Sequence, residues 1–298
     1  MNRITVFTPT YNRGNLLKKG YEALLRQEDK RFEWLIIDDG SQDNTKEIVE
    51  QWINEKKIDI RYIYKENGGL HTAYNVAIAN INTELAVCVD SDDFLADDAI
   101  FRILNFWDNN KESRYAGIVG LDCDLSGNII GDKLPDKKSV NLIDLLVGKY
   151  KIVNGDRKVV VRTELYKQVA PMKTFNGEKN FNPHYMHLLI SKKYDFLVLN
   201  QKLCVVEYQN DGMSAGILKQ YYDSPNSFME IRRLYMSFEQ AGLFFKIRQA
   251  IHFDSSCIIA HCKKKIICGS PNPVLTVLFS PFGWILSMFI KVKVRGTK

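Results

Sequence analysis

Three aspartates lie within one four-residue segment, Asp90-Ser91-Asp92-Asp93. Carboxylates packed this closely repel one another unless a cation neutralises them. Oxygen ligands suit Mg²⁺ or Mn²⁺, and such sites commonly share the ion with the phosphates of a substrate. The segment therefore predicts a metal–diphosphate site. The alternative is a solvated loop before a helix, because Asp97-Asp98 follows and can cap one.

A second pair of carboxylates, Asp38-Asp39, follows the apolar run Trp34–Ile37. A carboxylate there can accept hydrogen bonds from the base or ribose of a nucleotide. The alternative is a turn, which the following Gly40-Ser41 also favours. Further along, Gly68-Gly69 lets the backbone approach a ligand closely, and the helix expected from Leu70 offers amide donors to a phosphate.

The elements that must position these segments are alternating strands and helices. Strands are expected at Arg3–Phe7, Phe32–Ile37, Ile58–Tyr64 and Leu85–Val89, and helices at Asn15–Gln27, Asn44–Lys56, Leu70–Ile81 and Asp97–Trp107. This alternation predicts an α/β fold with a parallel sheet, and the unbroken apolar strands indicate that both faces are covered. Ligands bind at the carboxyl ends of such strands. The segments after three of the strands should therefore converge on one edge.

The pattern is weaker beyond residue 110. Strands are expected at Tyr115–Asp122, Lys158–Arg162, Phe196–Leu199 and Leu203–Tyr208, and helices at Leu142–Leu146, Tyr185–Lys192 and Ser227–Gln249. The last of these is predicted as one long amphipathic helix.

The composition is that of a globular chain, with 298 residues, 45% of them apolar and 26% charged. The net charge of +6 is concentrated at the carboxyl end, because residues 255–298 hold seven Lys and Arg and no Asp or Glu. A basic tail suits an anionic surface, either phospholipid or nucleic acid. The six cysteines fit no zinc or disulfide spacing, and no apolar signal region opens the chain, so a reducing cytosol is expected.

Residues 271–290 carry no charge and lie between Lys263–Lys265 and Lys291–Arg295. Twenty uncharged residues approach the length that spans a bilayer. However, Pro281 and Gly283 interrupt the stretch, and positive charge lies at both ends rather than on one side. We therefore expect two short amphipathic pieces in the membrane interface, with lysines on anionic headgroups. A pair of core helices and a single spanning helix are the alternatives.

Four segments within residues 3–100 carry a family resemblance: Thr8-Pro9-Thr10-Tyr11-Asn12-Arg13, Ile36-Ile37-Asp38-Asp39-Gly40-Ser41-Gln42-Asp43-Asn44-Thr45, Glu66-Asn67-Gly68-Gly69 and Val89-Asp90-Ser91-Asp92-Asp93. Together they resemble family 2 of the nucleotide-sugar glycosyltransferases, which has the GT-A fold and inverts the anomeric configuration.

The resemblance implies a role for each segment. Pro9, Tyr11, Asp38 and Asp39 would lie around the nucleoside, with Gly69 also on the donor side. A DXD motif at Asp90, Ser91 and Asp92 would meet the ribose, the diphosphate and a divalent metal, Mn²⁺ or Mg²⁺, with Asp90 and Asp92 as the ligands. Asp93 would lie next to them, towards the acceptor.

The second half resembles one branch of this family more loosely, through Gly177-Glu178-Lys179, Asn200–Leu203 and Glu207–Ser214. Inverting transfer needs a base to remove the proton of the acceptor hydroxyl. In that branch an acidic residue is expected directly after the proline of this loop, whereas here His184 stands at that position. Glu178 and His184 are therefore both candidates for the base, because imidazole can do the same work near pH 7.

Two further residues keep alternatives open. His184 and His187, three residues apart, could instead ligate the metal, or simply pack in a helix. Asp211 could contact the acceptor, or form the turn that Asp-Gly favours.

The sequence thus predicts a GT-A enzyme, with a Rossmann-like, mostly parallel central sheet flanked by helices and a helical C-terminal tail. Residues 1–110 would bind the nucleotide sugar, residues 111–215 would form the acceptor side of the same domain, and residues 216–298 would form a basic tail at the membrane. The expected donor is a UDP-sugar. The expected acceptor is a glycan, polyprenyl-diphosphate-linked, in polysaccharide, O-antigen or capsule biosynthesis at the inner face of the plasma membrane. Nucleic acid is not an expected partner.

Two rival functions remain. A sugar nucleotidyltransferase would carry a Gly-rich phosphate loop near its N-terminus, which Thr8–Tyr11 does not offer. A non-catalytic nucleotide-sugar-binding subunit of the same fold is supported only by the histidine at position 184.

Overall fold

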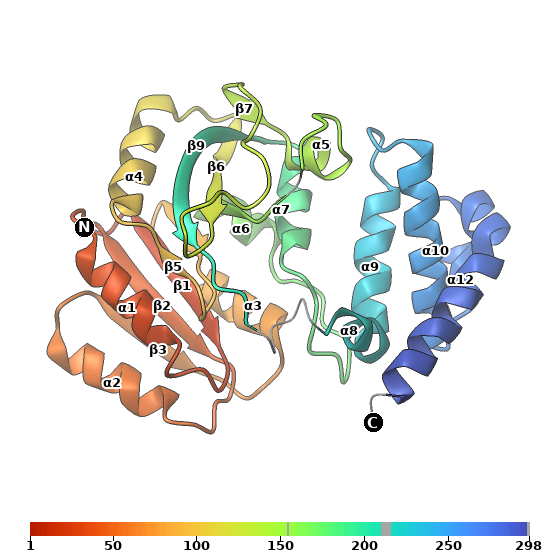
Figure 1. Cartoon of the computed structure of the whole chain (residues 1–298), viewed down its shortest axis with the longest axis horizontal. Coiled ribbons are helices and arrows are strands. Elements are labelled where there is room, and N and C mark those ends of the chain that lie inside the picture. Colours follow the sequence, from red (N-terminus) through yellow and green to blue (C-terminus); the bar gives the residue numbers. More distant parts are fainter. Residues whose placement is uncertain (154, 210–215, 297–298) are drawn as a thin grey trace. The chain divides into compact units, whose positions relative to one another are not determined.

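The computed structural model describes residues 1–153, 155–209 and 216–296. The chain forms two compact units (Figure 1). Unit 1 comprises Met1–Met172 and Met186–Gln209, and unit 2 comprises Lys173–Tyr185 and Asn210–Lys298. Residues 173–185, expected on the acceptor side of the large domain, thus belong to unit 2.

Unit 1 is built on one mixed sheet that contains nine strands within the described residues. The strands are β1 Ile4–Thr10, β2 Phe32–Asp38, β3 Ile60–Tyr64, β4 Leu85–Cys88, β5 Phe94–Leu95, β6 Tyr115–Cys123, β7 Ser139–Val140, β8 Arg157–Arg162 and β9 Asp195–Val205. Their order is β3-β2-β1-β4-β8-β6-β9-β5, and β7 pairs with β9. The strands β1 to β4, β6 and β9 run in one direction, while β8 is antiparallel to β4 and β6. The prediction of a mostly parallel central sheet is confirmed.

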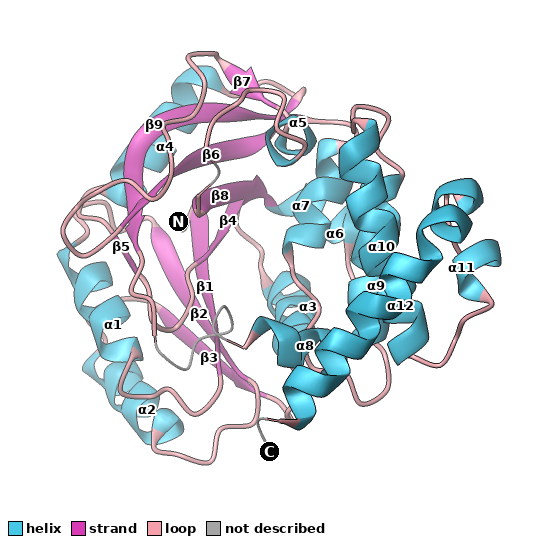
Figure 2. Ribbon diagram, turned by 45° about the vertical axis from the view of Figure 1, so that its right-hand side comes forward, coloured by secondary structure: helices cyan, strands magenta, loops and turns pink. Residues whose placement is uncertain are grey.

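Helices cover both faces of this sheet (Figure 2). They are α1 Leu17–Arg26, α2 Thr45–Glu55, α3 Leu70–Asn80, α4 Ala99–Asn110, α5 Leu142–Leu146, α6 Thr163–Val169 and α7 His184–Ser191, the last of which begins in unit 2. On one face α1, α2 and α4 pack over β1 and β2, where Tyr21 stacks on Trp52 with ring centroids 4.4 Å apart. On the other face Phe7 of β1 meets Tyr74 of α3. Burial on both faces explains why these strands are apolar without alternation.

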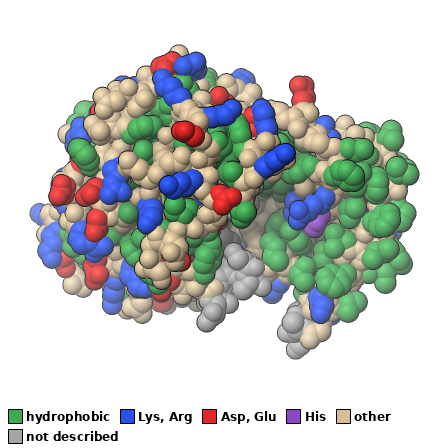
Figure 3. Space-filling model, turned by 45° about the horizontal axis from the view of Figure 1, so that its top comes forward, with side chains coloured by type: hydrophobic (Ala, Val, Ile, Leu, Met, Phe, Trp, Pro, Cys, Tyr) green, Lys and Arg blue, Asp and Glu red, His purple; other side chains and the backbone are tan. Residues whose placement is uncertain are grey.

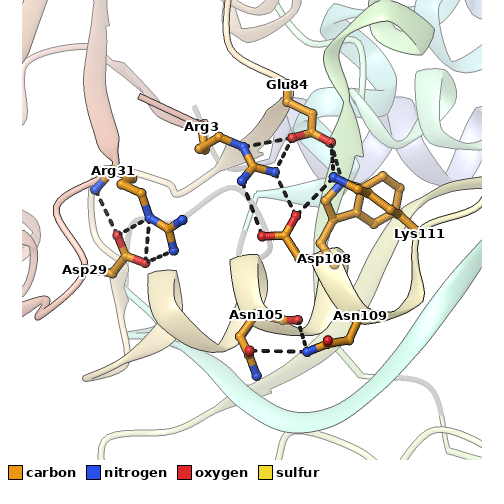
Figure 4. Close-up of polar contacts among 9 residues, drawn as sticks. Arg3, Asp29, Arg31, Glu84, Asn105, Asp108, Asn109 and Lys111 are labelled. Atoms are coloured by element: carbon orange, nitrogen blue, oxygen red, sulfur yellow. Dashed lines mark hydrogen bonds and ion pairs between the residues drawn. The ribbon is translucent and has the colours of Figure 1, made fainter. Parts of the chain in front are cut away.

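The amino-terminal end of β1 is held by paired surface charges (Figure 4). The Arg3 guanidinium donates to the carboxylates of Glu84 and Asp108, and Lys111 lies 3.0 Å from Asp108. These contacts hold the pKa of Asp108 at about 2, chiefly through the hydrogen bond from Arg3. Two cations thus face two anions at this edge, so no net charge is left for a ligand to neutralise.

Unit 2 is helical, with α8 Ile217–Asp223, α9 Pro225–Met236, α10 Leu243–Ile259, α11 Lys265–Cys268 and α12 Pro273–Arg295. The prediction of one helix over residues 227–249 is wrong, because α9 ends at Met236 and α10 begins only at Leu243. Ser237 turns its hydroxyl back to the Leu234 carbonyl, and Gly242 before α10 is extended, with φ −66° and ψ 162°.

The prediction of two short helices in the tail is also wrong, because α12 runs without interruption past Pro281. A proline lacks the N–H that would bond to the carbonyl four residues earlier. Here the Ser280 hydroxyl donates to that carbonyl, the one of Val277, at 2.9 Å. The lost backbone hydrogen bond is thereby replaced.

Candidate active site

The three polar segments come together as expected at the carboxyl ends of β1, β2 and β4. In the parallel register Thr10 lies opposite Asp38, and Phe7 lies opposite Cys88. The backbone continues this pairing, because the Asp39 amide donates to the Thr10 carbonyl at 2.8 Å. Pro9 is a buried residue of β1, while Tyr11, just beyond the strand, is 46% exposed.

The two aspartates after β2 are buried and bind the neighbouring loops. Asp38 accepts hydrogen bonds from the Ser41 amide at 2.7 Å and from the Tyr62 hydroxyl at 2.6 Å. The Ser41 contact is the turn that the sequence also allowed. Asp39 accepts from the Gly69 amide at 2.7 Å and forms an ion pair with Lys65.

Gly69 itself has a φ of 92°, a backbone conformation that glycine adopts most readily. Through the Gly69 amide, Asp39 fixes the loop that leads into α3. The sequence did not show that the second acidic cluster and the two glycines would be in direct contact.

The segment after β4 contains carboxylates in different environments. Asp90 is exposed, and its hydrogen-bond partner in the described chain is the Cys88 thiol at 3.7 Å. Asp92 lies 2.9 Å from the Arg13 guanidinium, which also reaches Ser91 at 3.4 Å.

Asp93, expected towards the acceptor, is buried beneath this segment. It accepts a hydrogen bond from the Glu207 amide at 3.3 Å. Burial raises the pKa of Asp93 to about 7 and that of Asp122 on β6 to about 6, and in both cases Lys158 opposes the rise. The Lys158 ammonium on β8 is itself buried, 4.0 Å from Asp93 and 3.9 Å from Asp122.

Sequence reasoning missed Lys158, Asp122 and Arg13. The first two stand inside apolar strand runs, where a charged residue is rare unless it is paired. That signal was present, since Lys158 precedes Val159–Val161 and Asp122 follows Gly117–Leu121. What the sequence could not show is that β8 inserts between β4 and β6, which brings Lys158 under the aspartates.

The residues present fit a divalent cation held by Asp90 and Asp92. Both offer carboxylate oxygens, the donor type that Mg²⁺ and Mn²⁺ prefer. Four carboxylates, those of Asp90, Asp92, Asp93 and Asp122, face two cations, Arg13 and Lys158. Within the described residues no three His, Cys, Asp or Glu side chains form a complete metal site. Phosphate and water oxygens would have to complete the shell, as is usual for Mg²⁺.

Glu178, one candidate for the base, is bound at the start of α9 in unit 2. Its two oxygens accept four hydrogen bonds, from the amides and side chains of Asn226 and Ser227, at 2.7–2.9 Å. Donors at a helix N-terminus favour a negative charge. Both Glu178 oxygens are therefore occupied by donors at the start of α9.

The two candidate histidines both lie on α7. His184 is the first residue of α7, and burial lowers its pKa to about 4. His187, in the next turn, has its Nε2 atom 2.7 Å from the Tyr166 hydroxyl. Asp211 lies outside the described residues.

The strand order, the helices on both faces and the loops at one edge are those of a GT-A fold. Solved structures bear this out. The structure of S. aureus TarS 1-349 in complex with UDP-GlcNAc has a TM-score of 0.59 at 17% identity, covering 99% of this chain and 92% of TarS. The mannosyltransferase PcManGT from Pyrobaculum calidifontis, in complex with GDP-Man and Mn²⁺, has a TM-score of 0.59 at 16% identity, covering 99% and 83%.

Sequence comparison points to the same class of protein. Residues 5–132 match the model of glycosyl transferase family 2. An uncharacterised glycosyltransferase of Haemophilus influenzae is 31% identical over 154 residues, which is 51% of this chain and 61% of that protein. The GalNAc(5)-diNAcBac-PP-undecaprenol beta-1,3-glucosyltransferase of Campylobacter jejuni is 24% identical over 78% of this chain and 74% of its own length. The chain spans less than two thirds of the first curated relatives it matches.

Proposed function

We propose that the protein is an inverting glycosyltransferase that moves a sugar from a UDP-sugar to a glycan acceptor in the synthesis of a surface polysaccharide, such as O-antigen or capsule. The observation that carries the proposal is the excess of carboxylates at the sheet edge where the loops after β1, β2 and β4 meet. A nucleotide diphosphate with its cation is a ligand that such an edge can hold. The family match of residues 5–132 and the UDP-GlcNAc complex of TarS support the same donor class.

On the donor side, each residue has a part that its environment allows. Tyr11 exposes an aromatic ring that can stack on the base, and Pro9 and Asp38 are buried residues of β1 and β2. Asp39 holds the Gly69 amide and so shapes the loop expected near the phosphates. Ser91, held by Arg13, lies between the two ligand aspartates.

Asp90 and Asp92 would hold the divalent cation, which supplies Lewis-acid stabilisation to the departing diphosphate. Arg13 already provides one positive charge to Asp92. Its guanidinium is thus suited to contact a diphosphate oxygen when the donor is bound. The complex of PcManGT with Mn²⁺ supports divalent metal use, and we propose Mn²⁺ or Mg²⁺ for this chain.

We propose His184 as the general base, in preference to Glu178. A neutral imidazole can take a proton, whereas each oxygen of Glu178 already accepts two hydrogen bonds. The acceptor hydroxyl would lose its proton to the imidazole while its oxygen bonds to the anomeric carbon and the bond to the diphosphate breaks. Asp93 and Asp211 remain proposed acceptor-side residues.

For the acceptor, we propose a polyprenyl-diphosphate-linked glycan and a location at the inner face of the plasma membrane. The name of the C. jejuni relative contains such a lipid-linked acceptor. Among the described residues one helix, α12, is long and apolar enough to cross a membrane by length and composition.

The test is metal-dependent donor binding and transfer in Asp92→Asn. With a panel of nucleotide sugars, the wild-type chain should be thermally stabilised by one donor only when Mn²⁺ or Mg²⁺ is present. Asp92→Asn should lose this stabilisation and transfer sugar at least about 100-fold more slowly, because several kcal/mol of charge stabilisation are removed. Asp97→Asn, which changes an exposed aspartate paired with Arg26, is the control and should behave as wild type. Full transfer by Asp92→Asn would contradict the proposal.

A further inference from the structure

Helix α12 places its side chains in the reverse of the usual arrangement. Its buried residues include the small and polar Thr276, Gly283 and Ser287. Every exposed position from 274 to 292 is apolar, and among these are the large side chains of Leu278, Phe282, Trp284, Ile285, Phe289 and Val292. A helix on the surface of a soluble domain buries its large apolar residues instead. Figure 3 shows hydrophobic side chains gathered over the helices of unit 2.

The inward face of α12 is fixed by close packing. A Cβ atom at Gly283 would lie 2.5 Å from the Cβ of Asp254 and 3.1 Å from the Ile251 carbonyl of α10. The Thr276 hydroxyl donates to the carbonyl of Ile266 in α11 at 2.6 Å. A larger residue would not fit at position 283, so α12 cannot rotate to bury Phe282 and Trp284. The apolar face is therefore a stable feature of this unit.

The positive charges around this apolar face indicate what kind of partner it binds. Lys263–Lys265 precede α12, and Lys291, Lys293 and Arg295 stand in its last turns, while residues 255–298 contain no acidic side chain. Lysine and arginine beside an apolar helical face match the anionic headgroups and acyl chains of a bilayer surface. A second copy of this chain would bring the same positive charges together.

We infer that α12 lies flat in the interface of an anionic membrane, with the face around Phe282, Trp284 and Phe289 in the acyl region. This inference deepens the proposed membrane location and rests on it, but it does not depend on which sugar is transferred.

The packing of unit 2 also distinguishes between α12 lying flat in the interface and α12 spanning the bilayer. With 23 residues, α12 is about 34 Å long, enough to cross a bilayer, so length does not decide. However, α10 packs along α12, and α9 packs along α10. These helices carry Arg232, Arg248 and Asp254, which a spanning α12 would draw into the hydrocarbon. A flat α12 leaves them behind it, away from the acyl chains.

The chain contains its own reporter for this orientation. Of its four tryptophans, Trp34, Trp52 and Trp107 are buried, whereas Trp284 is 54% exposed and stands at the midpoint of α12. A flat helix places Trp284 about 5–10 Å deep, near the headgroups. A spanning helix would place it at the bilayer centre.

The experiment mixes the full-length protein with vesicles of phosphatidylcholine, with or without phosphatidylglycerol, and records tryptophan emission. A blue shift is expected only with phosphatidylglycerol, and Trp284→Phe should abolish it. Lipids brominated close to the headgroup should quench the emission roughly twice as strongly as lipids brominated at the chain end, given the expected depth. Phe282→Ser should weaken vesicle binding about ten-fold or more through lost apolar burial. Phe101→Ser, which changes a similarly exposed phenylalanine of α4, should not weaken it.

Three outcomes would overturn the inference: stronger quenching from the chain ends, equal binding by Phe282→Ser, or no binding together with dimers in sedimentation. The first indicates a spanning helix, and the last indicates a second copy on this face. Donor binding by the same samples, measured without vesicles, tests the proposed function separately.

Discussion

Two regions of this chain reverse the usual placement of polar and apolar groups. In unit 1, beneath the sheet edge where the loops after β1, β2 and β4 meet, Lys158 is buried with Asp93 and Asp122. On α12 of unit 2, Phe282 and Trp284 face outward. The amino-terminal edge of the sheet shows the ordinary arrangement, because Arg3 meets its carboxylates at the surface.

Each reversal costs stability in the isolated chain, and the proposed ligands would relieve it in different ways. Buried carboxylates in excess of cations are stabilised by an added positive charge, and an exposed apolar face is stabilised by lipid. Both proposals thus place a ligand where the isolated chain has an unfavourable arrangement of side chains. Departures of this kind are expected at functional sites.

The largest effect is expected for Lys158→Met. This change leaves Asp93 and Asp122 buried without their shared cation, so the free energy of unfolding should fall by about 3–5 kcal/mol. Urea unfolding measures it. The control is Lys167→Met on the exposed side of α6, which should change stability by less than about 0.5 kcal/mol. Equal stability in both variants would mean that the buried charges are not coupled.

The next effect is expected for Asp254→Asn, in the contact between α10 and α12. Asp254 is fully buried, neither of its oxygens has a hydrogen-bond partner among the described residues, and burial raises its pKa to about 8. A raised carboxyl pKa means that the folded state binds more protons than the unfolded state between pH 4 and pH 8. The wild-type chain therefore loses stability as the pH rises through this window.

Asp254→Asn does not titrate, so the gain in its free energy of unfolding over wild type should grow from less than about 1 kcal/mol at pH 4 to about 4–5 kcal/mol at pH 8. Thermal unfolding at both pH values measures this difference. Asp223→Asn, in the partly exposed pair with Lys219, should shift stability by at most about 0.5 kcal/mol at either pH. A gain that does not depend on pH would contradict the prediction.

For Glu178→Gln, the free energy of unfolding should fall by about 2 kcal/mol. This variant keeps the shape of the side chain but removes the charge that accepts the hydrogen bonds from the start of α9. If Glu178 is structural, the midpoint of unfolding falls while kcat of the folded variant stays within about two-fold. If it is the base, kcat falls by about 10²–10⁴. His184→Ala is the matched variant, and the proposed role requires the large loss of kcat there.

The sequence predicted the strands and helices of residues 1–110 well because the signals there are local. Unbroken apolar strands, helical spacing and polar segments at strand ends give the sheet edge from Thr8 to Asp93 without knowledge of distant contacts. The site beneath it depends on β8 lying between β4 and β6, and nothing local indicates that Lys158 meets Asp122. Similarly, the sequence does not show that Glu178 contacts the start of α9, because that partner lies 48 residues away. The break at Ser237 and the continuity at Pro281 depend on single side-chain hydrogen bonds, which hydrophobic periodicity does not report.

The smallest effect is expected for Gly283→Ala, which adds one methyl group between α12 and Asp254. That methyl would overlap the Asp254 side chain, so the helices must separate slightly, at a cost of about 1–3 kcal/mol in unit 2. Gly242→Ala is the matched control, because a Cβ there meets nothing within 4 Å. Thermal unfolding compares the two. If Gly283→Ala is as stable as Gly242→Ala, then α12 is not held in the orientation that turns Trp284 outward. Only the buried charges of unit 1 would then remain as a fixed departure from the usual placement of polar and apolar groups.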